Sequence, residues 1–182
     1  MKGHIKIAKY NFSVTNVGSY SFAFISDLHD VHPLLIMDAI YDIGVDAILV
    51  PGDFIHNSSL FKRGLDFLSS ASYLAPTFCS LGNHEMKFDG DIKTLVKDTG
   101  AILLDNESYM FGGVNIGGLT SGYKVGQKQK RFGETPAPDL EWLEEYSKQE
   151  GYKILMSHHP EYYDSYIKKA PIGCLNYYFT EN

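Results

Sequence analysis

The sequence predicts an α/β fold in which a parallel sheet is followed by antiparallel strands. In the first half of the chain, short apolar runs alternate with segments whose apolar residues recur at helical spacing. Strands separated by helices in this way are typical of a parallel sheet with right-handed crossovers. Further along, two short strand-like runs flank Gly112-Gly113, which predicts an antiparallel hairpin.

The first elements follow from local patterns. Residues 4–14 largely alternate apolar and polar side chains, which predicts an exposed strand. The stretch from Phe22 to His29 opens with an apolar run that predicts the first buried strand. A helix is expected over residues 33–43, because its apolar residues fall at i, i+3, i+4 and i+7 and Pro33 suits a first helical turn. Gly44 ends this helix.

The same alternation continues to the middle of the chain. Residues 47–50 are apolar and residues 77–81 are mostly so, which predicts two further buried strands. Residues 60–73 carry an apolar stripe at helical spacing, which predicts the helix between them. A short helix is expected at residues 92–96.

The second half of the chain has a different pattern. Residues 101–104, 109–111 and 114–119 are short strand-like runs that predict an antiparallel meander. The remaining elements are expected at residues 138–147 (helix), 152–156 (strand) and 161–169 (helix).

Composition limits the class of protein. With 182 residues and 44% hydrophobic residues, we expect one globular domain over residues 1–182. The net charge of -6 argues against nucleic acid as the main partner, and no apolar run is long enough for a membrane span. Cys79 and Cys174 form no metal-binding or disulfide pattern, so we expect free thiols and a cytoplasmic location.

Polar side chains that can bind metals follow four of the predicted strands. Open α/β sheets bind their ligands at the carboxyl ends of strands, so these side chains are expected to converge. They are Asp27 and His29, Asp53, Asn83 and His84, and His158 and His159. Carboxylate, amide and imidazole groups together predict a site for divalent metal ions.

The segments DLH, GD, GNHE and SHHP resemble the motifs of the calcineurin-like metallophosphoesterases. That family's pattern is DxH, GDxx, GNH[DE], a later His and finally GHxH, and the resemblance covers roughly residues 4–171. It implies a two-sheet β-sandwich flanked by helices, a four-layer fold, with a dinuclear metal centre at the strand ends.

The resemblance also implies the role of each metal ligand. Asp27 and His29 would bind the first metal, and Asp53 would bridge both metals. Asn83 and His158 would bind the second metal. The cofactors would be two divalent ions, with Mn, Fe, Zn and Ni all compatible with these ligands.

The resemblance further implies a metal-dependent phosphoesterase that hydrolyses a phosphomonoester or phosphodiester through a metal-bridged hydroxide. His84 resembles the family's catalytic histidine, which contacts the phosphate and protonates the leaving group. His158 is preferred over His159 because the family's ligand directly follows the strand and its Ser. The other histidines, His4, His32 and His56, are expected at the surface or behind the ligands.

The final GHxH motif has no counterpart, because no histidine follows His159. Residues 172–182 depart from the family pattern, so we expect a fold that is incomplete at its C-terminus. Fewer protein ligands predict weakened metal binding and reduced activity. The strand at residues 4–14 would then lack a partner, which predicts self-association through its free edge. The alternative is a catalytically impaired scaffold for metal or protein binding, a use of this fold seen in the vacuolar-sorting member that serves retromer.

Overall fold

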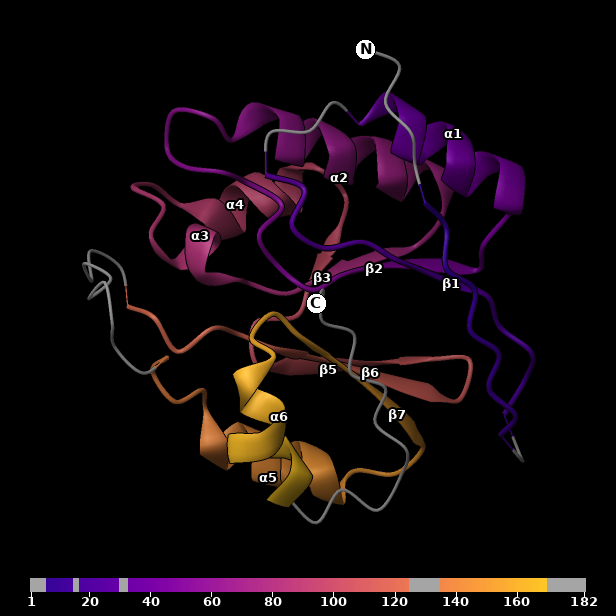
Figure 1. The fold of residues 1–182 in the computed structure, drawn as a ribbon, viewed down its shortest axis with the longest axis vertical. Coiled ribbons are helices and arrows are strands. Elements are labelled where there is room, and N and C mark those ends of the chain that lie inside the picture. The colour runs from indigo at the N-terminus through magenta and orange to yellow at the C-terminus, as the bar shows by residue number, and fades with distance from the viewer. Residues whose placement is uncertain (1–5, 15–16, 30–32, 125–134, 170–182) are drawn as a thin grey trace.

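The computed structural model describes residues 6–14, 17–29, 33–124 and 135–169. Two sheets lie face to face, and helices cover the outer face of each (Figure 1). The order of layers is helix, sheet, sheet, helix. The predicted α/β class, with a two-sheet sandwich flanked by helices, is therefore confirmed.

The first sheet is parallel and has the strand order β1-β2-β3-β4. Its strands are β1 (Phe22–Phe24), β2 (Ala47–Val50), β3 (Thr77–Cys79) and β4 (Ile102–Leu103). The helices of this half are α1 (Leu34–Ile43), α2 (Lys62–Leu74), α3 (Asn83–Met86) and α4 (Ile92–Asp98). Each strand is joined to the next through one or two of these helices, as the alternating sequence pattern predicts.

The second sheet has the strand order β5-β6-β7. β5 (Glu107–Phe111) and β6 (Val114–Leu119) form the predicted antiparallel hairpin around the two glycines, and β7 (Tyr152–Ser157) pairs parallel with β6. The helices α5 (Leu140–Lys148) and α6 (Glu161–Ser165) cover its outer face, and a 3-10 turn follows at Ile167–Lys169 (Figure 1).

Strand β2 shows how one short apolar run supports two layers. Its residues are all buried, and successive side chains point to opposite faces. Ile48 and Val50 pack with Phe67 in the core beneath the first helix layer. Leu49 packs on the other side, with Phe78 of β3 and Ile116 of β6, in the core between the sheets.

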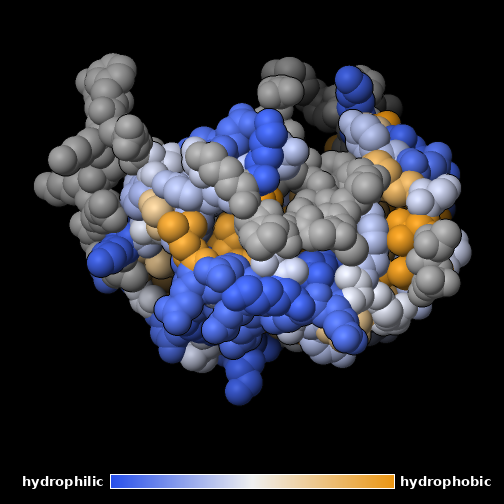
Figure 2. All heavy atoms as spheres, turned by 90° about the horizontal axis from the view of Figure 1, so that it is seen from below, coloured by the Kyte–Doolittle hydropathy of each residue, from blue (hydrophilic) through white to orange (hydrophobic). Residues whose placement is uncertain are grey.

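A third core lies between the second sheet and its helices. Leu119 of β6 and Leu155 of β7 pack there against Tyr146 of α5 and Tyr162 of α6. The Tyr146 hydroxyl donates to the backbone oxygens of Asn115 and Ile154, so its polar atom is satisfied in this buried position. Figure 2 views the molecule from this side and shows a mainly hydrophilic outer surface with smaller apolar areas.

Two of the sequence predictions are wrong. Residues 6–14 form no strand, and the side chains that were expected to alternate in burial, such as Ile7 and Tyr10, are exposed. The meander is also wrong, because β4 pairs parallel with β3 in the first sheet. The alternation of residues 6–14 therefore buries no face, and the short run at 101–104 completes the first sheet instead of starting the second.

Other predictions concern burial and membranes. Cys79 is a free thiol, as expected, and it is fully buried. In the part of the chain that the structure describes, no helix is both long and apolar enough to cross a membrane. Cys174 and the departure at residues 172–182 lie outside the described residues.

Candidate metal centre

The predicted site residues come together where the carboxyl ends of β1, β2 and β3 in the first sheet meet the carboxyl end of β7 in the second sheet. Those that follow the first sheet's strands are Asp27 and His29 after β1, Asp53 after β2, and Asn83 and His84 after β3. His158 follows β7 directly, and its Nε2 lies 3.1 Å from Asp53 Oδ2. Because β7 belongs to the second sheet, the site lies between the two sheets and not along one sheet edge.

Asp53 is the centre of this arrangement and is only 2% exposed. One carboxylate oxygen, Oδ1, accepts the backbone N–H of His84 at 3.0 Å. The other, Oδ2, lies 3.1 Å from His158 Nε2 and 3.7 Å from His84 Nε2. The Asp53 carbonyl accepts the backbone N–H of His29 at 3.2 Å. Through its carboxylate and its backbone carbonyl, this one residue thus contacts the segments that follow three other strands.

The backbone is strained at this site. Asp27, His29 and Asp53 have φ angles of 53°, 39° and 50°, in the left-handed region that side-chain-bearing residues seldom adopt. Each such residue costs about 1–2 kcal/mol relative to an ordinary conformation. Strain of this kind is retained mostly where a binding or catalytic function requires the side chain to point in a particular direction.

Glu85 fixes the turns on which these residues lie. It is buried, and its Oε2 accepts the backbone N–H groups of Asp53 at 2.8 Å and Gly82 at 2.9 Å. Its Oε1 accepts the N–H of Ile55 at 3.0 Å. Burial and the nearby Asp53 charge raise the pKa of Glu85 to about 7, against the opposing effect of the three N–H groups. One side chain of α3 therefore holds the end of β2.

His158 and Asn83 bring two further ligand atoms to Asp53. His158 Nε2 lies 3.2 Å from Asn83 Oδ1, so two oxygens and one nitrogen face one another. Burial alone would lower the pKa of His158, but its hydrogen bond to Asp53 and the Asp53 charge raise it above the ordinary value. For Asp53 the effects have the opposite signs. Burial alone would raise its pKa, but the hydrogen bond and charge of His158 outweigh burial and lower the pKa below the ordinary value.

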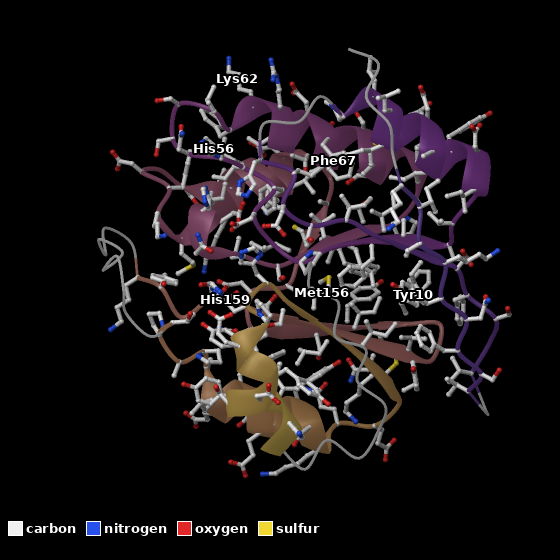
Figure 3. The ribbon with its side chains drawn as sticks, viewed as in Figure 1. Tyr10, His56, Lys62, Phe67, Met156 and His159 are labelled. Atoms are coloured by element: carbon white, nitrogen blue, oxygen red, sulfur yellow. The ribbon has the colours of Figure 1, made fainter. Side chains whose placement is uncertain are left out.

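His159 lies in a different environment from His158. Its Nε2 contacts Ser121 Oγ at 2.6 Å, and its ring packs against Tyr162. Figure 3 labels His159 beside the second sheet. Burial lowers the pKa of His159 to about 4, and the neighbouring His158 charge adds to the effect. This buried, neutral imidazole supports the packing of α6 and does not face Asp53.

Three imidazoles form a second group beside Asp53. The ring centroids of His29 and His84 are 4.6 Å apart, and that of His56 lies 5.5 Å from His29 and 5.4 Å from His84. The Nδ1 of His84 contacts the backbone oxygen of His56. Since a carbonyl oxygen only accepts, the hydrogen of a neutral His84 is on Nδ1. Its Nε2 is then an acceptor that faces Asp53.

The donor atoms are close enough to fit divalent cations. Ligand atoms of Asp27, Asp53 and His158 all lie within 4.8 Å of one another, and the same holds for His29, His56 and His84. The Nδ1 atoms of His29 and His158 are buried and have no hydrogen-bond partner among the described residues. Carboxylate and imidazole donors gathered in this way match the chemistry of metal sites.

Sequence reasoning missed the proximity of His56 to His29 and His84, and the contacts of Glu85. His56 was expected at the surface or behind the ligands. It is exposed, as expected, and its imidazole also lies beside those of His29 and His84. A signal was present, because His56 is three residues after Asp53. Glu85 is part of the GNHE segment, but nothing in the sequence indicates which backbone N–H groups its carboxylate binds.

Comparison with known proteins identifies the family. The family model described as calcineurin-like phosphoesterase matches residues 20–178, which is most of the chain. No curated protein matches the chain. The matched range includes each strand of the described residues and all the strand-end residues named above. The chain therefore belongs to the calcineurin-like phosphoesterase family.

Proposed function

We propose that the chain hydrolyses a phosphomonoester or phosphodiester at a dinuclear metal centre built on Asp53. The observation that carries this proposal is the buried Asp53 carboxylate, with His158 Nε2 at 3.1 Å and His84 Nε2 at 3.7 Å. The family supports metal-dependent phosphoester hydrolysis in general. The number of metals, their identity and the substrate are part of the proposal.

Each ligand's proposed position follows from its neighbours. Asp53 would be shared, because its two carboxylate oxygens face different groups. Asp27 and His29, whose side chains lie 3.6 Å apart, would bind one cation. Asn83 and His158 would bind the other. Two divalent cations there would supply a nucleophile from water near neutral pH and neutralise charge on the phosphoryl oxygens.

His84 is the proposed proton donor to the leaving group. Its side chain is 28% exposed, so a substrate can approach it while the ring stays anchored. The His56 carbonyl holds Nδ1, which leaves Nε2 directed toward Asp53. When His84 is protonated, Nε2 carries the second hydrogen and can give it to a departing oxygen.

The test compares Asp53→Asn with Asp66→Asn, a matched change at an exposed position of α2. Hydrolysis of a chromogenic phosphodiester and a chromogenic phosphomonoester is measured with added Mn²⁺, using protein shown to be folded. We expect Asp53→Asn to lower turnover by about 100-fold or more and Asp66→Asn to leave it unchanged. The ratio of the two wild-type rates would assign the substrate class.

No turnover from folded, metal-loaded wild-type protein would refute the proposal and favour the scaffold alternative. A further set of expectations stays as predictions: a single domain over residues 1–182, a cytoplasmic location, self-association, and weakened metal binding. The free strand edge that was expected to drive self-association is not found at residues 6–14, because these residues do not form a strand.

A further inference from the structure

The outer surface of the helix layer formed by α1 and α2 exposes large apolar side chains. Both helices connect successive parallel strands and pack on the same core, so they lie side by side and run in the same direction (Figure 1). Tyr73 of α2 is 92% exposed, and Tyr41 of α1 is 74% exposed. The other exposed apolar side chains of the two helices are Leu34, Leu35, Ile43 and Leu74. Apolar surface gathered in this way is typical of an interaction site.

A groove of about 600 Å³ lies between the C-terminal halves of α1 and α2. Its lining includes Tyr41 and the buried Met37 from α1, and Tyr73 and Leu74 from α2. Asp38 is the one charged residue that lines it. Aromatic rings beside a carboxylate suit a basic side chain, because its apolar stem packs on the rings and its charge meets the carboxylate.

Charge is unevenly distributed along this layer. Lys62 and Arg63 lie at the start of α2, whereas Asp38 and Asp42 lie in the middle and last turn of α1, and all four are exposed. Lys62 projects from the outer side of α2 (Figure 3). Neither helix has a basic residue in its last turn, so the negative ends of both helix dipoles add to the acidic side chains. The layer is therefore basic at its start and acidic toward its end.

We propose that this helix layer is an interface between two copies of the chain related by a two-fold axis. Lys62 of each copy occupies the groove of the other, with its stem on Tyr73 and its ammonium group beside Asp38. Lys62 and Ser69, which lines the groove, are about 10 Å apart along α2. A two-fold axis near Asp66, midway between them, thus sets the basic start of each copy against the acidic end of the other.

A second copy fits this surface because both halves of the charge pattern lie on the same layer. A two-fold interface requires a surface that is complementary to itself, and this one pairs its own basic and acidic ends. The two Asp66 carboxylates, which lie near the axis, oppose association. The paired Lys62 and Asp38 charges and the four tyrosine rings from two copies outweigh this repulsion.

This interface goes beyond the proposed hydrolysis and does not depend on it. None of its residues is a proposed metal ligand or the proposed proton donor. It also assigns the predicted self-association to a helix surface in place of the strand edge expected at residues 6–14, which is not found there.

The experiment measures association of the full chain by sedimentation velocity over about 5–500 µM. The chain has a mass of 20.4 kDa, and we expect a species of twice this mass to form as the concentration rises. Tyr73→Ser should weaken association by about 10-fold or more, because exposed tyrosines supply much of the contact area at such interfaces. The control Leu140→Ser, at a position of α5 that is 47% exposed, should associate as the wild type does.

Exchange of the two charges tests the arrangement itself. Lys62→Asp and Asp38→Lys should each weaken association by about 10–100-fold, because each places like charges together twice. The double variant restores opposite charges and should return to within about threefold of the wild type.

Unchanged association in Tyr73→Ser, or a double variant as weak as the single ones, would overturn the proposal. A monomer at every concentration would also overturn it and leave the groove to a basic segment of another protein. Hydrolysis that depends on Asp53 could still be found in each case, so failure here is distinct from failure of the proposed function.

Discussion

Gly82 allows the ends of β2 and β3 to approach closely, and adding one methyl group there tests the site. A Cβ at Gly82 would lie 2.2 Å from Asp53 Oδ1 and 2.7 Å from the Asp53 backbone nitrogen. Ordinary van der Waals contact begins near 3.4 Å, so these atoms would have to separate by about 1 Å. The backbone of Asp53 cannot move freely, because its N–H donates to the buried Glu85.

The expected cost comes from overpacking. Methyl groups forced into a well-packed interior cost about 1–3 kcal/mol, and the contact with backbone atoms places Gly82→Ala near 3 kcal/mol. The φ angle at Gly82 is -84°, so backbone conformation adds no penalty of its own. Because Asp53 must shift, we also expect Mn²⁺ affinity to fall by about 10–100-fold.

Gly44→Ala is the matched control. Its Cβ would meet no atom within 4 Å, but its φ angle of +66° is in the left-handed region. We expect its free energy of unfolding to fall by about 1 kcal/mol because of backbone conformation alone, and its Mn²⁺ affinity to stay unchanged. Urea denaturation and calorimetry measure both quantities. A Gly82→Ala protein within about 0.5 kcal/mol of the wild type, with wild-type Mn²⁺ affinity, would refute this reasoning.

Two further changes test the elements around the site. Glu85→Gln keeps the size of the side chain but replaces one acceptor oxygen with an NH₂ group that faces a backbone N–H. We expect the free energy of unfolding, measured by urea denaturation at pH 8, to fall by about 1–3 kcal/mol. The control Glu145→Gln, at an exposed position, should leave it unchanged. Equal stability of the two variants would contradict the role of Glu85. Burial raises the pKa of Tyr162 to about 12, with its Gly122 N–H contact opposing the shift. The folded protein thus holds the phenol proton more tightly than the unfolded chain. This stabilisation is present below pH 10 and falls by about 2 kcal/mol as the pH rises to 12. Between pH 9 and 12, the free energy of unfolding measured by chemical denaturation should fall less for Tyr162→Phe than for the wild type. An equal fall for the two proteins would contradict this role of Tyr162.

The sequence predicts those features that depend on local pattern. Strand β2 and helix α1 are found near their predicted bounds, because burial and helical periodicity are properties of neighbouring residues. The hairpin of β5 and β6 is also predicted, since Gly112 and Gly113 both have positive φ angles and form its turn.

Features that depend on distant partners are not predicted. The run at 101–104 has the same composition whether it pairs with β3 or β5, and only packing of the whole chain selects β3. Residues 6–14 alternate like a strand, but their apolar side chains are exposed and no ladder forms. His56 likewise depends on the path of the chain after Asp53, which brings its ring to His29 and His84.

The segment Gly82-Asn83-His84-Glu85 shows why four adjacent residues can serve one site in four ways. Successive residues of a helical turn point about 100° apart, so the side chains diverge. Asn83 Oδ1 lies beside His158, and His84 points toward Asp53 and His56. Glu85 points inward and binds backbone N–H groups, while Gly82 has no side chain because Asp53 occupies that space. The predicted ligands can therefore be read from the segment, but the anchoring role of Glu85 requires the buried backbone that only the fold supplies.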